Sequence, residues 1–204
     1  MGYLNDFLSL DCYNDVLNAV GIINNKTKEI SESMAIIKQL KKIILNTNDE
    51  YVLYDLCAGN ALTSVTASHL FKLKNTIAYD IKERIRSWEL VKRFKYINID
   101  IYDDYNTFIS IKDPSIIIGV HACTDLAKQI IEIYNHSNAS HLILMPCCRE
   151  KVSSSDIPKL IQAKIGGYLA WCYYLSKQCE GKVKIVEDKN ILSPCNCIII
   201  AHKY

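Results

Sequence analysis

The sequence predicts an α/β fold of three layers, in which helices cover both faces of a seven-stranded, mostly parallel sheet. From residue 51 onward, short apolar segments alternate with longer segments of helical character. The apolar segments are nearly continuous in hydrophobicity, which is typical of parallel strands buried on both faces. The last two are separated by about seven residues, too few for a crossover helix, so we expect the last strand to run antiparallel.

Strands are expected at 51–58, 75–81, 95–101, 115–122, 141–147, 182–187 and 195–202. Helices are expected at 61–71, 82–93 and 124–134, and a long helix or helix pair at 156–178 around Gly166 and Gly167. Residues 1–48 are expected to be helical, with Met34, Ile37 and Leu40 at helical spacing. The α/β pattern is complete without them, so we expect a domain at 49–204 and an N-terminal lid or substrate wall at 1–48.

Composition excludes several classes of protein. The chain has 204 residues, of which 50% are hydrophobic and 23% charged, and a net charge of +2, which fits one folded domain and not a disordered chain. No apolar run approaches the roughly 18 residues that cross a bilayer, and no basic signal sequence opens the chain. Nine cysteines without an export signal indicate reduced thiols without disulfides, so we expect a cytoplasmic protein that does not insert into membranes.

A turn of small residues follows the first expected strand. Asp55 lies in the last part of that strand, and the turn contains Gly59 and Asn60, so the backbone can approach a nucleoside at the start of the next helix. The second strand ends at Asp80, 25 positions after Asp55, where a carboxylate can accept both ribose hydroxyls. Asn60 tolerates a left-handed backbone, and Ala61 is small, which keeps the turn feasible with one glycine. The alternative is a plain strand-to-helix turn with Asp55 as a helix N-cap.

The absence of further glycines in the turn indicates which type of nucleoside cofactor it can bind. An NAD enzyme would also fit Asp80, but a pyrophosphate requires the closely packed glycines that are missing, and a dehydrogenase normally has a second domain. S-adenosylmethionine carries no phosphate and is the expected cofactor. Asp100, at the end of the third strand, can hold the adenine, or can be an ordinary loop acid. The expected cofactor-binding residues are Asp55, Cys57, Ala58, Gly59, Asn60, Asp80, Ile81, Asp100, Ile101 and His121.

Two motifs follow the fourth and fifth expected strands. The first is the run H-A-C-T-D-L-A at 121–127, and the second is P-C-C at 146–148. Together with the turn and Asp80, they resemble a group of class I, Rossmann-like methyltransferases that is distantly related to tRNA ribose 2′-O-methyltransferases. The resemblance covers residues from about 50 to 204. Ala61 and Thr124 depart from it, since glycine is usual at both positions.

The resemblance implies S-adenosylmethionine-dependent methyl transfer, with RNA as the favoured acceptor. A protein or small-molecule methyltransferase, or a non-catalytic module that binds the cofactor, is the alternative. Methyl transfer is an in-line displacement that depends mainly on alignment, and a hydroxyl acceptor also benefits from a base. His121 and Asp125 are the candidate catalytic residues. Their structural alternatives are a histidine that satisfies backbone groups at a strand end and a helix N-cap.

Basic residues around the expected helix at 82–93 offer an RNA-contacting face, but Glu83 and Glu89 interrupt them, and a solvated helix face is the alternative.

Four cysteines are expected at neighbouring strand ends: Cys57, Cys123, Cys147 and Cys148. With His121 they could hold zinc or an iron–sulfur cluster. However, no C-x-x-C pair is present, and Cys147 and Cys148 would point to opposite sides if the strand continued through them. We therefore expect no metal. A covalent methyl-cysteine mechanism would require a thiol with a depressed pKa.

Overall fold

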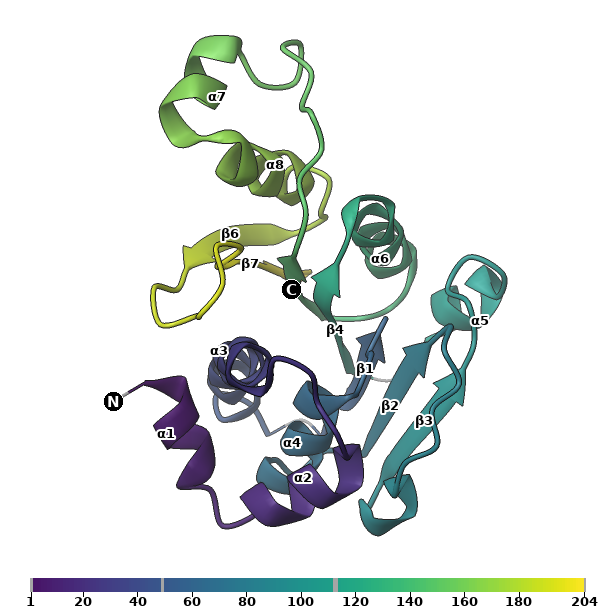
Figure 1. Cartoon of the computed structure of the whole chain (residues 1–204). Helices are drawn as coiled ribbons and strands as arrows, with labels where there is room; N and C mark the ends of the chain where they lie inside the picture. Colours follow the sequence, from purple (N-terminus) through teal and green to yellow (C-terminus); the bar gives the residue numbers. More distant parts are fainter. Residues whose placement is uncertain (1, 49, 112–113, 204) are drawn as a thin grey trace.

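The computed structural model describes residues 2–48, 50–111 and 114–203. Its centre is a seven-stranded sheet with the order β3-β2-β1-β4-β5-β7-β6 (Figure 1). The strands are β1 (Val52–Leu56), β2 (Asn75–Asp80), β3 (Phe94–Asn98), β4 (Ser115–Ala122), β5 (His141–Pro146), β6 (Lys182–Glu187) and β7 (Cys197–His202). Neighbours from β3 to β5 pair in parallel, whereas β7 pairs antiparallel with both β5 and β6. The expected three-layer fold with an antiparallel last strand is therefore confirmed.

The strand order shows at which edge of the sheet a ligand is expected to bind. Chain order reverses between β1 and β4, which lie side by side at the centre of the sheet. In open parallel sheets, ligands bind at this switch point, beyond the carboxyl ends of the strands. The residues at and after the ends of β1, β2, β3 and β4 line the cavities at this edge.

The helices divide between the two faces of the sheet. α1 (Tyr3–Leu8), α2 (Tyr13–Val20), α3 (Lys26–Ile44) and α4 (Leu62–Leu70) pack in one hydrophobic cluster, and α5 (Tyr105–Ile109), α6 (Thr124–His136) and α8 (Gly167–Ser176) in the other (Figure 1). The short α7 (Lys159–Ile165) precedes α8, and Gly166, with φ of +82°, separates them, so the helix-pair alternative is confirmed. Among the described residues, no helix combines the length and the apolar character needed to span a bilayer.

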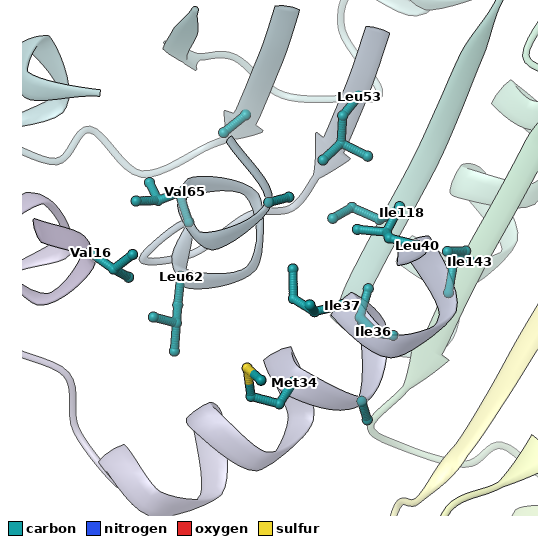
Figure 2. Packing of buried hydrophobic residues seen from close by; sticks show 14 of the residues in the cluster. Val16, Met34, Ile36, Ile37, Leu40, Leu53, Leu62, Val65, Ile118 and Ile143 are labelled. Carbon is teal, nitrogen blue, oxygen red and sulfur yellow. The ribbon is translucent and has the colours of Figure 1, made fainter. Parts of the chain in front are cut away.

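The long N-terminal helix α3 belongs to the hydrophobic core. Ile36 and Leu40 are fully buried and pack in the same cluster as Leu53 of β1, Ile118 of β4 and Ile143 of β5 (Figure 2). Burying one such side chain contributes about 1.5–3 kcal/mol, so α3 stabilises the sheet to which it binds. The domain boundary at residue 48 stays a prediction, but α3 is more than a lid over a finished core.

One predicted helix is wrong. Residues 82–93 contain a single 3-10 turn, Trp88–Leu90, and no α-helix. The ring of Trp88 stacks on Tyr96 with centroids 5.1 Å apart, which holds the segment against β3. The N-terminal helix α2 contacts both α4 and this turn, and its Val16 and Val20 are fully buried. Tertiary packing of α2 thus covers the face of the sheet that a crossover helix would otherwise cover.

Candidate active site

The turn after β1 is tied directly to the acid at the end of β2. The Gly59 amide donates a hydrogen bond to Asp80 Oδ2 at 2.8 Å, and the Lys82 amide donates to Oδ1 at 2.9 Å. The Ala58 amide donates to the Tyr79 carbonyl at 2.9 Å, which continues the pairing of β1 and β2 into the turn. Each carboxylate oxygen of Asp80 keeps a further lone pair, so the group can still accept hydroxyl donors.

The backbone of this turn is left-handed at three positions: Cys57 (φ +63°), Gly59 (φ +55°) and Ala61 (φ +54°). A Cβ at Gly59 would meet nothing within 4 Å, so the glycine serves backbone conformation and leaves open space beside it. Asn60, which could tolerate such a conformation, is not among these three positions. At Ala61 that conformation costs roughly 1–2 kcal/mol, which the surrounding contacts must offset.

Two adjoining cavities open at this edge of the sheet. One has a volume of about 230 Å³ and the other about 390 Å³. Cys57, Arg84 and His121 line both of them. The smaller is also lined by residues of the β1 turn, including Asp55, Ala58, Gly59 and Asn60, and the larger by Asp80, Ile81, Asp100 and Ile101. The structure therefore brings all ten residues expected to bind the cofactor onto the walls of these two cavities.

Asp55 is a buried carboxyl group with an unused oxygen. Its side chain lines the smaller cavity, only 1% of the residue is exposed, and Oδ1 has no hydrogen-bond partner among the described residues. Burial raises the pKa of Asp55 to about 7, and a hydrogen bond with Ser64 opposes that rise. Because an unpartnered buried oxygen is costly, this atom is suited to a donor group on a ligand.

The side wall of the smaller cavity comes from α3, through Glu29 and Ser33. Asn60 Nδ2 donates to Glu29 Oε2 at 3.4 Å, and burial raises the pKa of Glu29. One turn further along, the fully buried Glu32 contacts Nε2 of His121, while Lys28 Nζ lies 3.8 Å from Glu32 Oε1. These contacts fix the histidine ring from a helix almost ninety positions away in the chain.

Glu29 and Glu32 were not among the residues predicted from the sequence. A signal was present, because Glu29 and Glu32 lie at the helical spacing that continues to Ile36 and Leu40, on the face that α3 buries. An acid on the apolar face of an amphipathic helix indicates a specific partner.

His121 is placed by an irregularity of β4. The pairing of β4 with β5 shifts register between Val120 and Ala122, and His121 has φ of +62°. A non-glycine residue in this region is a strained conformation of the kind that clusters at functional sites.

Asp125 is not brought to either cavity. Its side chain is 75% exposed and pairs with Lys128 Nζ at 3.3 Å in the first turn of α6. The N-cap of that helix is Cys123, not Asp125.

Three of the four expected cysteines meet beyond the ends of β4 and β5. Cys123 Sγ lies 2.7 Å from Cys147 Sγ and 3.4 Å from Cys148 Sγ. Burial raises the pKa of Cys123 and, more strongly, that of Cys147, so neither has the depressed pKa that a covalent methyl-cysteine mechanism requires. Cys57 is separate and lines the cavities, and burial raises its pKa to about 12.

The sheet order, the switch-point cavities and the acid-bound glycine turn are typical of the Rossmann-like methyltransferase fold. A family model described as a methyltransferase domain matches residues 25–155, which is more than half of the chain. The chain therefore belongs to this methyltransferase-domain family. No curated protein matches it.

Solved structures agree with the fold. The methyltransferase domain of bacterial CtHen1 aligns with a TM-score of 0.55 at 11% identity, over 84% of this chain and 99% of that one. The 16S rRNA methylase ArmA aligns with a TM-score of 0.52 at 13% identity, over 100% and 99% of the two chains. A domain of EvdMO1 with SAH bound aligns with a TM-score of 0.52 at 6% identity, over 84% and 80%. At these identities the similarity shows a shared fold.

Proposed function

We propose that this protein is an S-adenosylmethionine-dependent methyltransferase that acts on RNA, with His121 as the base for a hydroxyl acceptor. The observation that carries the proposal is the pair of adjoining cavities with His121 and Cys57 in their common wall. A nucleoside fits one of them and an amino-acid moiety the other, so the reacting centre falls near the histidine.

The residues present fit the methyl donor. Asp80 would accept the ribose hydroxyls, Asp100 and Ile101 would border the adenine, and the unpartnered Asp55 Oδ1 would accept from the amino group. The donor supplies a methyl group activated on a sulfonium, so the protein has to align the acceptor and exclude water.

The role of His121 follows from its contact with Glu32. A carboxylate that accepts from Nε2–H holds the ring in one tautomer and leaves Nδ1 as the nitrogen free to take a proton. Glu32 is thus a positioning residue. The resemblance to ribose 2′-O-methyltransferases favours a hydroxyl acceptor, for which a base accelerates transfer by about 10²–10⁴-fold.

RNA as the acceptor class is supported by that resemblance and by the exposed basic residues at Lys82, Lys92, Arg93 and Lys95. One structural neighbour is itself an rRNA methylase by name.

A labelled-donor assay tests the proposal. The protein is incubated with S-adenosylmethionine carrying a labelled methyl group and with separated RNA, protein and small-molecule fractions of a cell extract. We expect the wild type to transfer label to RNA and the His121→Ala variant to transfer none. Label confined to protein or small molecules would contradict the acceptor class, and cofactor binding without transfer to any fraction would indicate a non-catalytic module.

A further inference from the structure

The three clustered thiols have no role in the proposed methyl transfer. Cys123 follows β4 and caps α6, while Cys147 and Cys148 follow β5. Strand β5 ends at Pro146, so the two adjacent cysteines are not held on opposite sides of a strand, and their Sγ atoms lie 3.5 Å apart. Of the two reasons to expect no metal, the opposite orientation of Cys147 and Cys148 therefore does not apply, and the absence of a C-x-x-C pair remains.

Hydrogen bonding alone gives little reason to gather three thiols. Thiols are weak donors and weak acceptors, so their mutual contacts contribute little. The other polar contacts of the cluster are mainly to backbone: Cys147 Sγ donates to the His121 carbonyl at 3.2 Å, and Cys195 Sγ donates to the Cys147 carbonyl at 2.9 Å.

The distances suit one cation. A zinc ion with Zn–S bonds of about 2.3 Å in a tetrahedron holds its sulfurs about 3.8 Å apart. Two of the three separations, 3.4 and 3.5 Å, are close to this value, and the third, 2.7 Å, needs the Cys123 and Cys147 side chains to spread. All three sulfur atoms lie within 4.8 Å of one another, as ligands of one ion must.

The chemistry of the donor set selects the metal. The cluster offers sulfur alone, since His121 Nε2 contacts Glu32, and Asp125 and Glu150 both pair with Lys128. Thiolates favour soft or borderline ions and disfavour Mg²⁺ and Ca²⁺. The start of the 13-residue helix α6 directly after Cys123 adds partial positive charge that favours thiolates.

We propose that Cys123, Cys147 and Cys148 bind one Zn²⁺ ion beside the cavities, with the fourth coordination position open to solvent. Binding forms three Zn–S bonds and releases the thiol protons to water. Cys148 is exposed, which leaves a path for the ion and for an external fourth ligand such as water. The site shares the His121 carbonyl, so an occupied site would also fix the loop ends that place this histidine.

Cobalt substitution tests the site independently of any methyltransferase activity. The full chain, reduced and freed of metal with a chelator, is titrated anaerobically with Co²⁺ and then with Zn²⁺. We expect one equivalent of Co²⁺ to give thiolate-to-cobalt charge transfer and the visible bands of a tetrahedral ion, and Zn²⁺ to displace it. A thiol count under denaturing conditions confirms that all nine cysteines are reduced.

Variants locate the ligands. Cys148→Ser removes an exposed ligand without opening a cavity, and should weaken binding by more than the roughly 10–100-fold that loss of a supporting residue costs. Cys179 lies outside the cluster, and its thiol donates to the Leu175 carbonyl. Cys179→Ser is therefore the matched control and should bind the metal as the wild type does. Circular dichroism verifies that both fold.

Three results would overturn the proposal. They are the absence of saturable binding near one equivalent, equal affinity in the Cys148→Ser and Cys179→Ser proteins, and a Cys123–Cys147 disulfide that survives the reducing treatment. A loss of binding in Cys195→Ser as large as in Cys148→Ser would contradict the open fourth position.

Discussion

The two halves of the candidate site are built in different ways. On the β1–β2 side, a glycine turn and Asp80 are joined by backbone-to-carboxylate hydrogen bonds between neighbouring strand ends. On the β4–β5 side, His121 depends on Glu32, a buried residue of α3 that is 89 positions away. The first half is therefore local to the sheet, whereas the second exists only once the N-terminal helix has packed. Substitutions can separate the two halves, because the first half should govern cofactor affinity and the second the rate of transfer.

The largest effect is expected for His121→Ala. Loss of a general base lowers kcat by about 10²–10⁴-fold, while cofactor affinity should fall much less because Asp80 and the glycine turn remain. Single-turnover transfer from labelled donor and calorimetry on the same protein measure the two effects. A fall in cofactor affinity with kcat unchanged at saturating cofactor would mean that His121 serves binding alone.

The second effect concerns Asp55 and pH. Its pKa is raised to about 7 in the folded protein from an ordinary value near 3.8. The folded state thus favours the protonated form of Asp55. The contribution of this group to the free energy of unfolding is therefore complete below pH of about 4 and is lost as pH rises through about 7. With about 1.36 kcal/mol per unit of pKa, the loss is on the order of 4 kcal/mol.

Urea denaturation of wild type and Asp55→Asn at several pH values between about 4 and about 7 measures this loss of stability. The wild type should lose stability relative to the variant as pH rises from about 4 to about 7. Parallel pH curves for the two proteins would contradict the burial of an unpartnered carboxyl group.

A smaller effect is expected for Glu32→Gln, which keeps the size of the side chain and removes its charge. We expect kcat to fall by about 10-fold, because the amide orients the histidine less well, with the Kd for the cofactor unchanged. Glu150→Gln, another acid near the sheet edge but outside both cavities, is the control. A fall in cofactor affinity with kcat intact would show that α3 shapes the binding site and does not position the base.

The smallest effect is expected for Asp125→Ala. Its side chain is exposed and its ion pair with Lys128 is of the surface type, worth about 0–1 kcal/mol. Activity should change by less than about threefold. A fall of a hundredfold in kcat would restore Asp125 as a catalytic residue and would require α6 to move toward the cavities on binding.

The sequence was informative wherever a signal is local. Strands β4 and β6 have the expected bounds, and the switch-point residues Asp55, Gly59 and Asp80 could be placed because the ends of adjacent parallel strands meet at one edge. The helix expected at 82–93 does not exist, because the stacking of Trp88 and the packing of α2 outweigh its helical propensity.

Contacts that depend on distant segments could not be predicted. Glu32 meets His121 only because α3 buries Ile36 and Leu40 against the sheet, and no spacing rule links residues 32 and 121. The convergence of Cys147 and Cys148 required the end of β5 at Pro146, since a strand longer by two residues would have separated them. The β1–β2 half of the site can thus be predicted from the strand pattern, whereas the half around His121 and Glu32 depends on tertiary packing.

Calorimetric titration of wild type and Asp80→Ala with S-adenosylmethionine, its demethylated product and NAD tests the central claim most directly. The account predicts binding of both methyl-cycle ligands, no binding of NAD, and a loss of about 100-fold or more in Asp80→Ala, as expected for charge-assisted hydrogen bonds worth about 1.5–3 kcal/mol each. An Asp103→Ala control, changed at an exposed acid outside both cavities, should bind as wild type does. Failure to bind either methyl-cycle ligand, or equal affinity in wild type and Asp80→Ala, would contradict the claim that Asp80 and the β1 turn bind the methyl donor.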